Sequence, residues 1–219
     1  MTTEPDLAPA ALLRAQEGPP VAADSTDPAR FVRAIEAIDA ANADDPNVIV
    51  IDGAPHPKEL AHARLATAWV QFFDPNAAEA QLLAARAHHL RRWTSPRDDY
   101  PRDRAGYLRW RAALKKRHAQ EVGEILRTAG YDEATIERVG QLVRKEGLAH
   151  DAQVQAHEDA LCLVFVQTQL QDLTVQLGDE RIVPIVQKTM KKMSPAAIAA
   201  VGLLDLSPTA TAVIARAAS

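Results

Sequence analysis

The sequence predicts an all-α fold, a single compact domain of many helices with at most one short strand or hairpin near residues 48–51. Two observations support this prediction. Hydrophobic residues make up 47% of the 219 residues but aromatic residues only 5%, and Ala and Leu are abundant, which favours helices over sheets. Apolar residues also recur at helical spacing in most segments between Pro, Gly and polar breaks. We expect about seven to ten helices, which form one domain over residues 27–219.

The N-terminal segment, residues 1–26, lacks a clear apolar period. It is rich in Ala, Pro, Asp and Glu, a composition that predicts a disordered tail with at most one weak helical turn at 10–16. Order is expected to begin at Ser25-Thr26-Asp27-Pro28, which offers a capping side chain and a proline at the first helical position. Val48–Ile51 is the one run that resembles a strand, and Asp52 and Gly53 end it, as in a short hairpin or a lone extended segment.

The later helices follow from their start and stop signals. Pro57, Asp132 and Asp151 are favourable first or capping residues, Asn76 and Glu79 have the spacing of a capping box, and Gly130 is a favourable C-cap. The apolar period then predicts helices over about 57–73, 76–93, 105–130, 132–147 and 151–177, followed by about two or three short ones.

Cysteine usage and hydropathy exclude several protein classes. The single cysteine, Cys162, rules out a disulfide within the chain and a zinc finger. No apolar stretch approaches the roughly 20 residues that cross a bilayer. The N-terminus has no signal-peptide pattern. We therefore expect a cytoplasmic protein without a membrane partner.

Histidines and one aspartate fall on the apolar faces of predicted helices. His62, His89 and His118 share faces with Leu, Ala, Val and Trp residues, and Asp159 lies on a helix that is apolar nearly all round. A buried carboxylate needs a cation, a metal or several hydrogen bonds. Converging imidazoles and a carboxylate predict a site for a divalent metal. The alternative is a set of ordinary core histidines, with Asp159 in a structural ion pair.

The segment from Arg86 to Arg117 is strongly basic although the chain carries a net charge of −4. It holds eleven Lys or Arg against three Asp, and four aromatic residues lie between them. Guanidinium groups bind phosphate in a bidentate manner and aromatic rings stack on bases, so the segment predicts recognition of an anion or of RNA. The alternative is a solvated helix face, which fits Lys115–Arg117 best. The loop 91–104 is the part that we expect to bind an anion.

From Phe31 to about Ala218 the sequence resembles the domain of unknown function 4202 family. The strings that carry the similarity include "AARAHHLRRWTSPRDDYPRDRAGYLRWRAALKKRHA" and "LVRKEGLAHDAQVQAHEDALCLVFV". The order of elements also resembles, more distantly, the HD superfamily of helical metal-dependent phosphohydrolases. That superfamily has a histidine on one helix, a His-Asp pair on the next and an aspartate on a late central helix.

The HD resemblance implies a set of metal ligands. His62 would be the first histidine, His88 and His89 would stand at the His-Asp pair, and Asp159 would be the final aspartate. A His-His pair in place of His-Asp leaves such a site with one carboxylate fewer.

Three hypotheses follow. In the first, the chain is an HD-like metal-dependent phosphohydrolase acting on a nucleotide or another small phosphate ester. A divalent Mn, Fe, Co or Zn ion would be held by His62, His88, His89 and Asp159, and His118 would be a general acid or a further ligand. Arg92, Arg97, Arg104 and Lys145 would stabilise the phosphate charge. In the second, segment 86–117 is a non-enzymatic RNA- or anion-binding module. In the third, the chain is a catalytically inactive HD-like scaffold.

Overall fold

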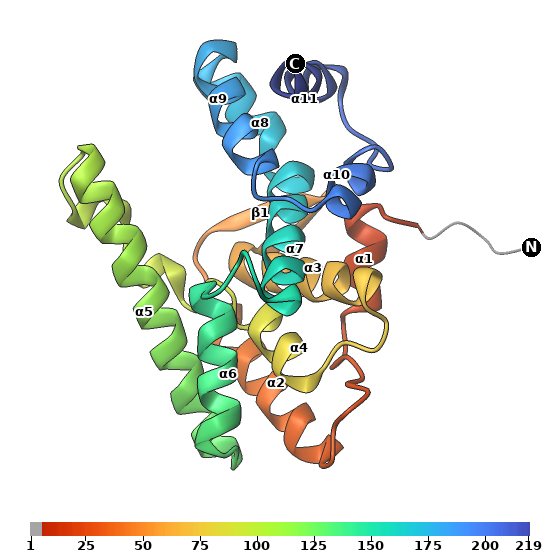
Figure 1. Cartoon of the computed structure of the whole chain (residues 1–219), viewed down its shortest axis with the longest axis vertical. Helices are drawn as coiled ribbons and strands as arrows, with labels where there is room; N and C mark the ends of the chain where they lie inside the picture. Colours follow the sequence, from red (N-terminus) through yellow and green to blue (C-terminus); the bar gives the residue numbers. More distant parts are fainter. Residues whose placement is uncertain (1–5) are drawn as a thin grey trace, which may run out of the picture.

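A computed structural model describes residues 6–219 of the chain, and within them the fold is mainly α-helical (Figure 1). The elements, in chain order, are α1 (Pro9–Ala15), α2 (Pro28–Ala43), β1 (Val48–Ile51), β2 (Ala54–Pro57), α3 (Lys58–Phe73), α4 (Glu79–Arg86), the 3-10 turns η1 (Arg92–Thr94) and η2 (Arg97–Asp99), α5 (Arg104–Ala129), α6 (Glu133–Arg144), α7 (Ala152–Thr168), α8 (Leu170–Leu177), α9 (Asp179–Met190), α10 (Pro195–Val201) and α11 (Pro208–Ala218). None of the helices described is long and apolar enough to cross a membrane.

The predicted caps at Asp132 and Asp151 and the predicted C-cap at Gly130 are confirmed, and short polar side chains also cap helices for which no cap was predicted. A side-chain oxygen at the N-cap accepts a backbone N–H of the first turn in six helices, from Asp27, Asp103, Asp132, Asp151, Ser194 and Ser207. Gly130 ends α5 with a φ of +93°, the left-handed conformation that glycine adopts most readily.

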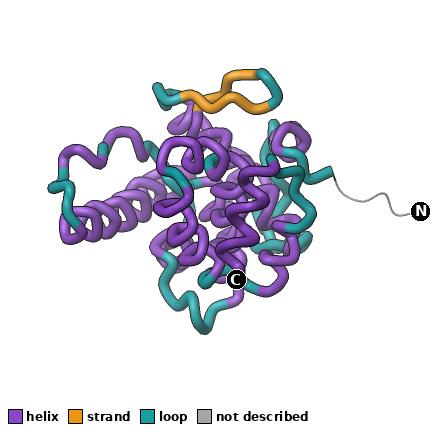
Figure 2. The backbone as a smooth tube through the Cα atoms, turned by 90° about the horizontal axis from the view of Figure 1, so that it is seen from above, coloured by secondary structure: helices purple, strands orange, loops and turns teal. Residues whose placement is uncertain are grey.

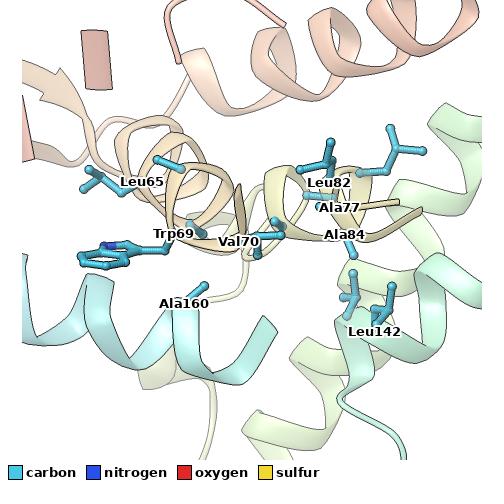
Figure 3. Packing of buried hydrophobic residues seen from close by; sticks show 14 of the residues in the cluster. Leu65, Trp69, Val70, Ala77, Leu82, Ala84, Leu142 and Ala160 are labelled. Atoms are coloured by element: carbon cyan, nitrogen blue, oxygen red, sulfur yellow. The ribbon is translucent and has the colours of Figure 1, made fainter. Parts of the chain in front are cut away.

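The main core lies where α3 and α4 meet α6 and α7. Val70 lies on the side of α3 that faces Leu82 and Ala84 of α4, whereas Leu65 and Trp69 lie on its opposite side (Figure 3). Ala160 of α7 lies below α3, and Leu142 of α6 lies below α4 (Figure 3). A second apolar cluster joins the end of α7 to α8, α9 and α11. The helices α3, α4 and α7 are therefore central, and side chains near their ends are positioned rigidly.

The strand-like run at 48–51 forms a hairpin, as predicted. β1 pairs antiparallel with β2, and the turn residues Asp52 and Gly53 both have positive φ, which suits the tight turn of a two-residue hairpin. Viewed from above, the hairpin lies at the edge of the helical body (Figure 2).

Two predicted helices are shorter than expected, and the described residues contain eleven α-helices, one more than predicted. The helix predicted over 76–93 covers only Glu79–Arg86, because His89 and Arg91 have positive φ and cannot continue it. Its first N–H is capped by Asp24 from outside the helix, and not by Asn76. The helix predicted over 151–177 breaks at Gln169, which separates α7 from α8.

Within the predicted tail over 1–26, where at most one weak helical turn was expected at 10–16, residues 9–15 form the helix α1 and pack on the core. Leu12 and Leu13 are buried there. Arg86 is fully buried and donates to the backbone oxygen of Gln16, just after α1, and to both carboxylate oxygens of Asp39. These contacts hold the segment in place, and sequence periodicity did not reveal them. The rest of the predicted tail, residues 1–5, lies outside the described residues.

The N-terminal half of α5 projects from the body of the molecule (Figures 1 and 2). It packs mainly on the loop that precedes it: Trp110 Nε1 donates to the Ser95 backbone oxygen at 3.0 Å. A Cβ at Gly106 would lie 2.1 Å from the Pro101 backbone oxygen, so only glycine permits this close approach. The basic loop is thereby fixed against the start of α5.

Candidate functional site

Four histidines from three parts of the fold meet beside α5. His88 and His89 follow α4, His118 lies in the middle of α5, and His157 lies on α7. The ring centroids are 4.0 Å apart for His88 and His89, 5.1 Å for His88 and His157, and 5.8 Å for His89 and His118. We call these four residues the histidine cluster.

Two ring nitrogens of the cluster are buried without a hydrogen-bond partner among the described residues. His157 Nε2 lies 3.3 Å from His88 Nδ1, so one of these imidazoles donates to the other. His157 Nδ1 and His118 Nε2 have no partner. A buried polar atom without a partner is costly, and it is therefore a common sign of a site that a ligand completes.

His89 has a defined proton arrangement. An Arg92 guanidinium nitrogen lies 3.0 Å from His89 Nε2, and because arginine only donates, Nε2 must accept. A neutral His89 then carries its proton on Nδ1, which lies 3.3 Å from Glu59 Oε2. Glu59 also lies 3.9 Å from Arg92 Nε. Glu59 at the start of α3 therefore orients both His89 and Arg92.

Lys145 approaches the cluster from the end of α6. Its φ of +61° places it in the left-handed region, which is unfavourable for residues other than glycine. Its Nζ lies 2.5 Å from Oε2 of the buried Glu158, and Lys192 lies 3.4 Å from the other carboxylate oxygen. Of the four non-glycine residues with positive φ among those described, three are Lys145, His89 and the neighbouring Arg91. Such strain concentrates at functional sites.

A small pocket opens between these elements. Its volume is about 20 Å³, and its walls are His88, His89, Arg92, Arg111, Leu114, Lys115, His118, Val143 and Lys145. Four of these side chains are cationic, and no carboxylate lines the described pocket. The Arg92 guanidinium lies 4.9 Å from the Trp110 ring centroid, a cation–π contact that fixes its position. The described lining of the pocket is therefore rich in positive charge.

Burial and the nearby cations keep the imidazoles neutral. Burial is the largest cause in each case; it lowers the pKa of His118 and of His157 to about 3 and that of His89 to about 4. The pKa of His88 is also lowered, by burial and by the charge of neighbouring groups. Burial opposes the negative charge of Glu59, but contacts with His89 and His62 outweigh it and lower the Glu59 pKa.

The predicted metal ligands do not come together as a set. His88 and His89 line the pocket. His62 does not line it, but its Nδ1 lies 3.7 Å from Glu59 Oε2, the oxygen that His89 Nδ1 also approaches, and its Nε2 lies 3.2 Å from Thr168 Oγ1. Asp159 Oδ1 accepts from the Ser194 backbone N–H at 2.8 Å and from Gln155 at 2.9 Å, so this carboxylate is used at the start of α10. No three His, Cys, Asp or Glu residues within 6–219 form a group that could hold a metal ion. The predicted four-residue set is thus not assembled among the described residues.

The predicted phosphate-binding residues divide into two pairs. Arg92 and Lys145 line the pocket, as does the predicted catalytic residue His118. Arg97 instead donates to the backbone oxygens of Tyr100 and Pro101 and shapes the loop. Arg104 is exposed at the start of α5.

Several residues of the site were not predicted from the sequence. Glu59 and Glu158 support the pocket from behind, His157 extends the histidine cluster, and Lys115 lines the pocket although a solvated position was expected for it. Glu59 and His62 stand three residues apart on an apolar helix, which is the one local signal that pointed to Glu59.

Comparison with known proteins identifies a family but no activity. No curated protein and no solved structure gives a significant match. The sequence profile of the domain of unknown function (DUF4202) matches residues 32–214, which include the histidine cluster and every residue that lines the pocket. The chain therefore belongs to the domain of unknown function 4202 family.

Proposed function

We propose that the chain binds the phosphate group of a small molecule, such as a nucleotide or another phosphate ester, at the pocket beside the histidine cluster. The observation that carries this proposal is the lining: four cationic side chains and three imidazoles surround one opening. The nearest carboxylates are already in ion pairs, Glu59 with Arg92 and Glu158 with Lys145. A phosphate is the common metabolite group whose charge and acceptor oxygens match this lining.

The size of the pocket indicates how the phosphate would sit. A volume of about 20 Å³ accepts one atom of the size of a water oxygen. One phosphoryl oxygen would therefore enter and accept a hydrogen bond from His118 Nε2, if the proton lies on that nitrogen. The other oxygens would stay at the opening, within reach of Arg92, Arg111 and Lys115. The Glu59 contact holds Arg92 ready for this role.

Isothermal titration with inorganic phosphate and with a mononucleotide tests the proposal. Arg111 lines the pocket and has no ion pair among the described residues, so Arg111→Ala should lose affinity without exposing a buried partner. The loss of one charge-assisted contact, about 1.5–3 kcal/mol, corresponds to at least about a tenfold weaker Kd. Arg109→Ala, at an exposed position two residues earlier on the same helix, is the matched control and should bind as the parent does. Equal affinity in both variants, or no binding by the parent, would contradict the proposal.

A second candidate is hydrolysis of the bound phosphate ester, and His118 favours it. Its Nε2 has no partner among the described residues, and its low pKa keeps the ring neutral. In the tautomer with the proton on Nδ1, Nε2 would accept a proton from an attacking water and would not donate to the phosphate. Release of phosphate from nucleotides would measure the reaction. His118→Asn should reduce the rate by about 10²–10⁴ while phosphate still binds. Binding without turnover on any phosphate ester would leave a binding protein, as in the inactive-scaffold hypothesis.

The HD-like relationship and its divalent ion stay predictions from the sequence. Elemental analysis of the purified protein tests them directly. A stoichiometric transition metal that disappears in Asp159→Ala would require Asp159 to leave Ser194 and would restore the predicted ligand set.

A further inference from the structure

Positive charge is concentrated in one segment of this acidic protein. Residues 86–117 hold eleven Lys or Arg and three Asp, whereas the rest of the chain holds fourteen Lys or Arg and twenty-six Asp or Glu. Much of this segment is the projecting half of α5 and the loop before it. A surface of one sign on an oppositely charged protein attracts a partner of complementary charge. This positive surface extends beyond the area that one phosphate would cover.

The cations of α5 continue outwards from the phosphate pocket along one helical face. Arg104, Tyr107, Arg111 and Lys115 are three, four and four residues apart, so they lie within about one third of the helix circumference. Arg111 and Lys115 line the pocket, and Arg104 is exposed at the far end. At 1.5 Å per residue the four residues span about 16 Å. We call them the α5 stripe.

The cations of the α5 stripe are not neutralised by ion pairs among the described residues, and an exposed aromatic ring lies between them. Among the described residues Arg104, Arg111 and Lys115 have no carboxylate in ion-pair distance, unlike Arg102 and Arg117, which pair with Asp98 and Glu121. Tyr107 is 43% exposed, and its hydroxyl accepts from Arg111 at 3.2 Å, which holds the ring beside the cations. An exposed ring between cations suits a base that stacks while its phosphates pair with the cations.

We propose that the molecule whose phosphate enters the pocket is a single-stranded nucleic acid, with its terminal phosphate in the pocket and its chain along the α5 stripe. This inference rests on the proposed function and names its ligand. The length of the stripe fits up to about five stacked nucleotides at about 3.4 Å each. A single strand fits better than a duplex, because Tyr107 can stack only on an unpaired base.

Binding of short oligonucleotides to the full chain tests the inference. The probes are oligouridylates of about eight nucleotides that carry a 5′ phosphate, a 3′ phosphate or neither, beside uridine monophosphate. We expect one phosphorylated strand to bind more tightly than both the unphosphorylated strand and the mononucleotide. Oligothymidylates with the same ends, compared in parallel, assign the strand to RNA or DNA.

The variants separate the stripe from the pocket. Arg104→Glu changes two charges, so the slope of log K against log salt should become shallower by about 1.4, and binding of the strand at about 0.1 M salt should weaken about 25-fold. Tyr107→Ala should weaken binding of the strand by about tenfold, the effect of losing one stacked base. Mononucleotide affinity should be unchanged in Arg104→Glu. Arg181→Glu, at an exposed position on α9 without an ion pair, is the control and should bind both ligands as the parent does.

Three outcomes would overturn the inference. A mononucleotide that binds as tightly as the strand would leave the proposed function intact but would refute the proposal that the ligand is a single-stranded nucleic acid. Equal affinity for phosphorylated and unphosphorylated strands would place the nucleic acid away from the pocket. Failure of both ligands to bind would remove the proposed function together with the inference.

Discussion

Lys145 occupies a left-handed backbone conformation that suits glycine. Replacing it with glycine separates the cost of this backbone strain from the role of the lysine side chain at the site. The variant Lys145→Gly relieves about 1–2 kcal/mol of left-handed strain but makes the unfolded chain more flexible, at a cost of about 0.5–1 kcal/mol. The backbone terms alone therefore leave stability near that of the parent or slightly above it.

The contact with Glu158 decides the sign of the effect. Burial opposes the charge of Glu158, and its two lysine neighbours nevertheless lower its pKa from 4.5 to about 2, which corresponds to about 3 kcal/mol of favourable interaction. Lys145 is the closer and more buried of the two lysines, at 2.5 Å against 3.4 Å for Lys192, so it supplies the larger part of this interaction. Burial lowers the pKa of Lys145 itself, which offsets part of the gain. We expect Lys145→Gly to lower the free energy of unfolding by about 1–2 kcal/mol at pH 7.

Urea unfolding of four proteins measures this coupling: the parent, Lys145→Gly, Glu158→Gln and the double variant. Because the double variant has no orphaned carboxylate, its stability should lie within about 1 kcal/mol of the parent, with an interaction energy near 2 kcal/mol between the two sites. Phosphate affinity should fall about tenfold in both variants that lack Lys145, whatever their stability. A Lys145→Gly variant that is more stable than the parent would refute the stabilising ion pair between Lys145 and Glu158. Unchanged phosphate affinity would show that Lys145 does not contribute to phosphate binding.

Three further predictions concern stability. His118 and His157 have folded pKa values of about 3, below the unfolded value of about 6.5, so the unfolded chain takes up their protons first as the pH falls. The free energy of unfolding should therefore fall by about 1 kcal/mol per histidine per pH unit below about pH 6. Urea midpoints that stay constant from about pH 7 to 5 would contradict this. Asp159→Asn should cost about 1–2 kcal/mol, because the amide oxygen caps Ser194 less well than a carboxylate, and should leave phosphate binding unchanged in titration calorimetry. Gly106→Ala should displace the preceding loop and accelerate its proteolysis, whereas Ala105→Gly at the exposed neighbouring position should not.

The helix ends that were predicted correctly are those whose caps are local. Asp132 and Asp151 cap their own helices, so a short stretch of sequence contains the whole signal. The end of α4 depends on a distant contact instead. The Arg91 N–H donates to Asn42 Oδ1 at 3.0 Å, across 49 residues of sequence, and this helps to fix the left-handed turn in a stretch whose composition favours a helix.

The site was predictable in part for the same reason. Periodicity correctly turned His62, His118 and Asp159 towards the interior, but it does not show which polar atom each of them meets there. It was wrong for His89, which follows the end of α4 and is only partly buried. Ser194, which Asp159 caps, is 35 residues away, and a metal ligand would give the same inward-facing pattern. The partnership of Glu158 with Lys145 was hidden because it depends on how α6 ends against α7.

The fully buried guanidinium of Arg86 bears on where the protein may be cut. The family profile begins at residue 32, yet Arg86 donates to the Gln16 backbone, and Asp24 caps α4 directly ahead of the histidine pair. A fragment trimmed to the family limits would keep the recognisable sequence but would lose both contacts and the cover that α1 gives the core. The stretch that the family profile covers is thus shorter than the stretch whose contacts support the site. Loss of binding by the shorter fragment would therefore reflect the missing contacts as much as the site itself.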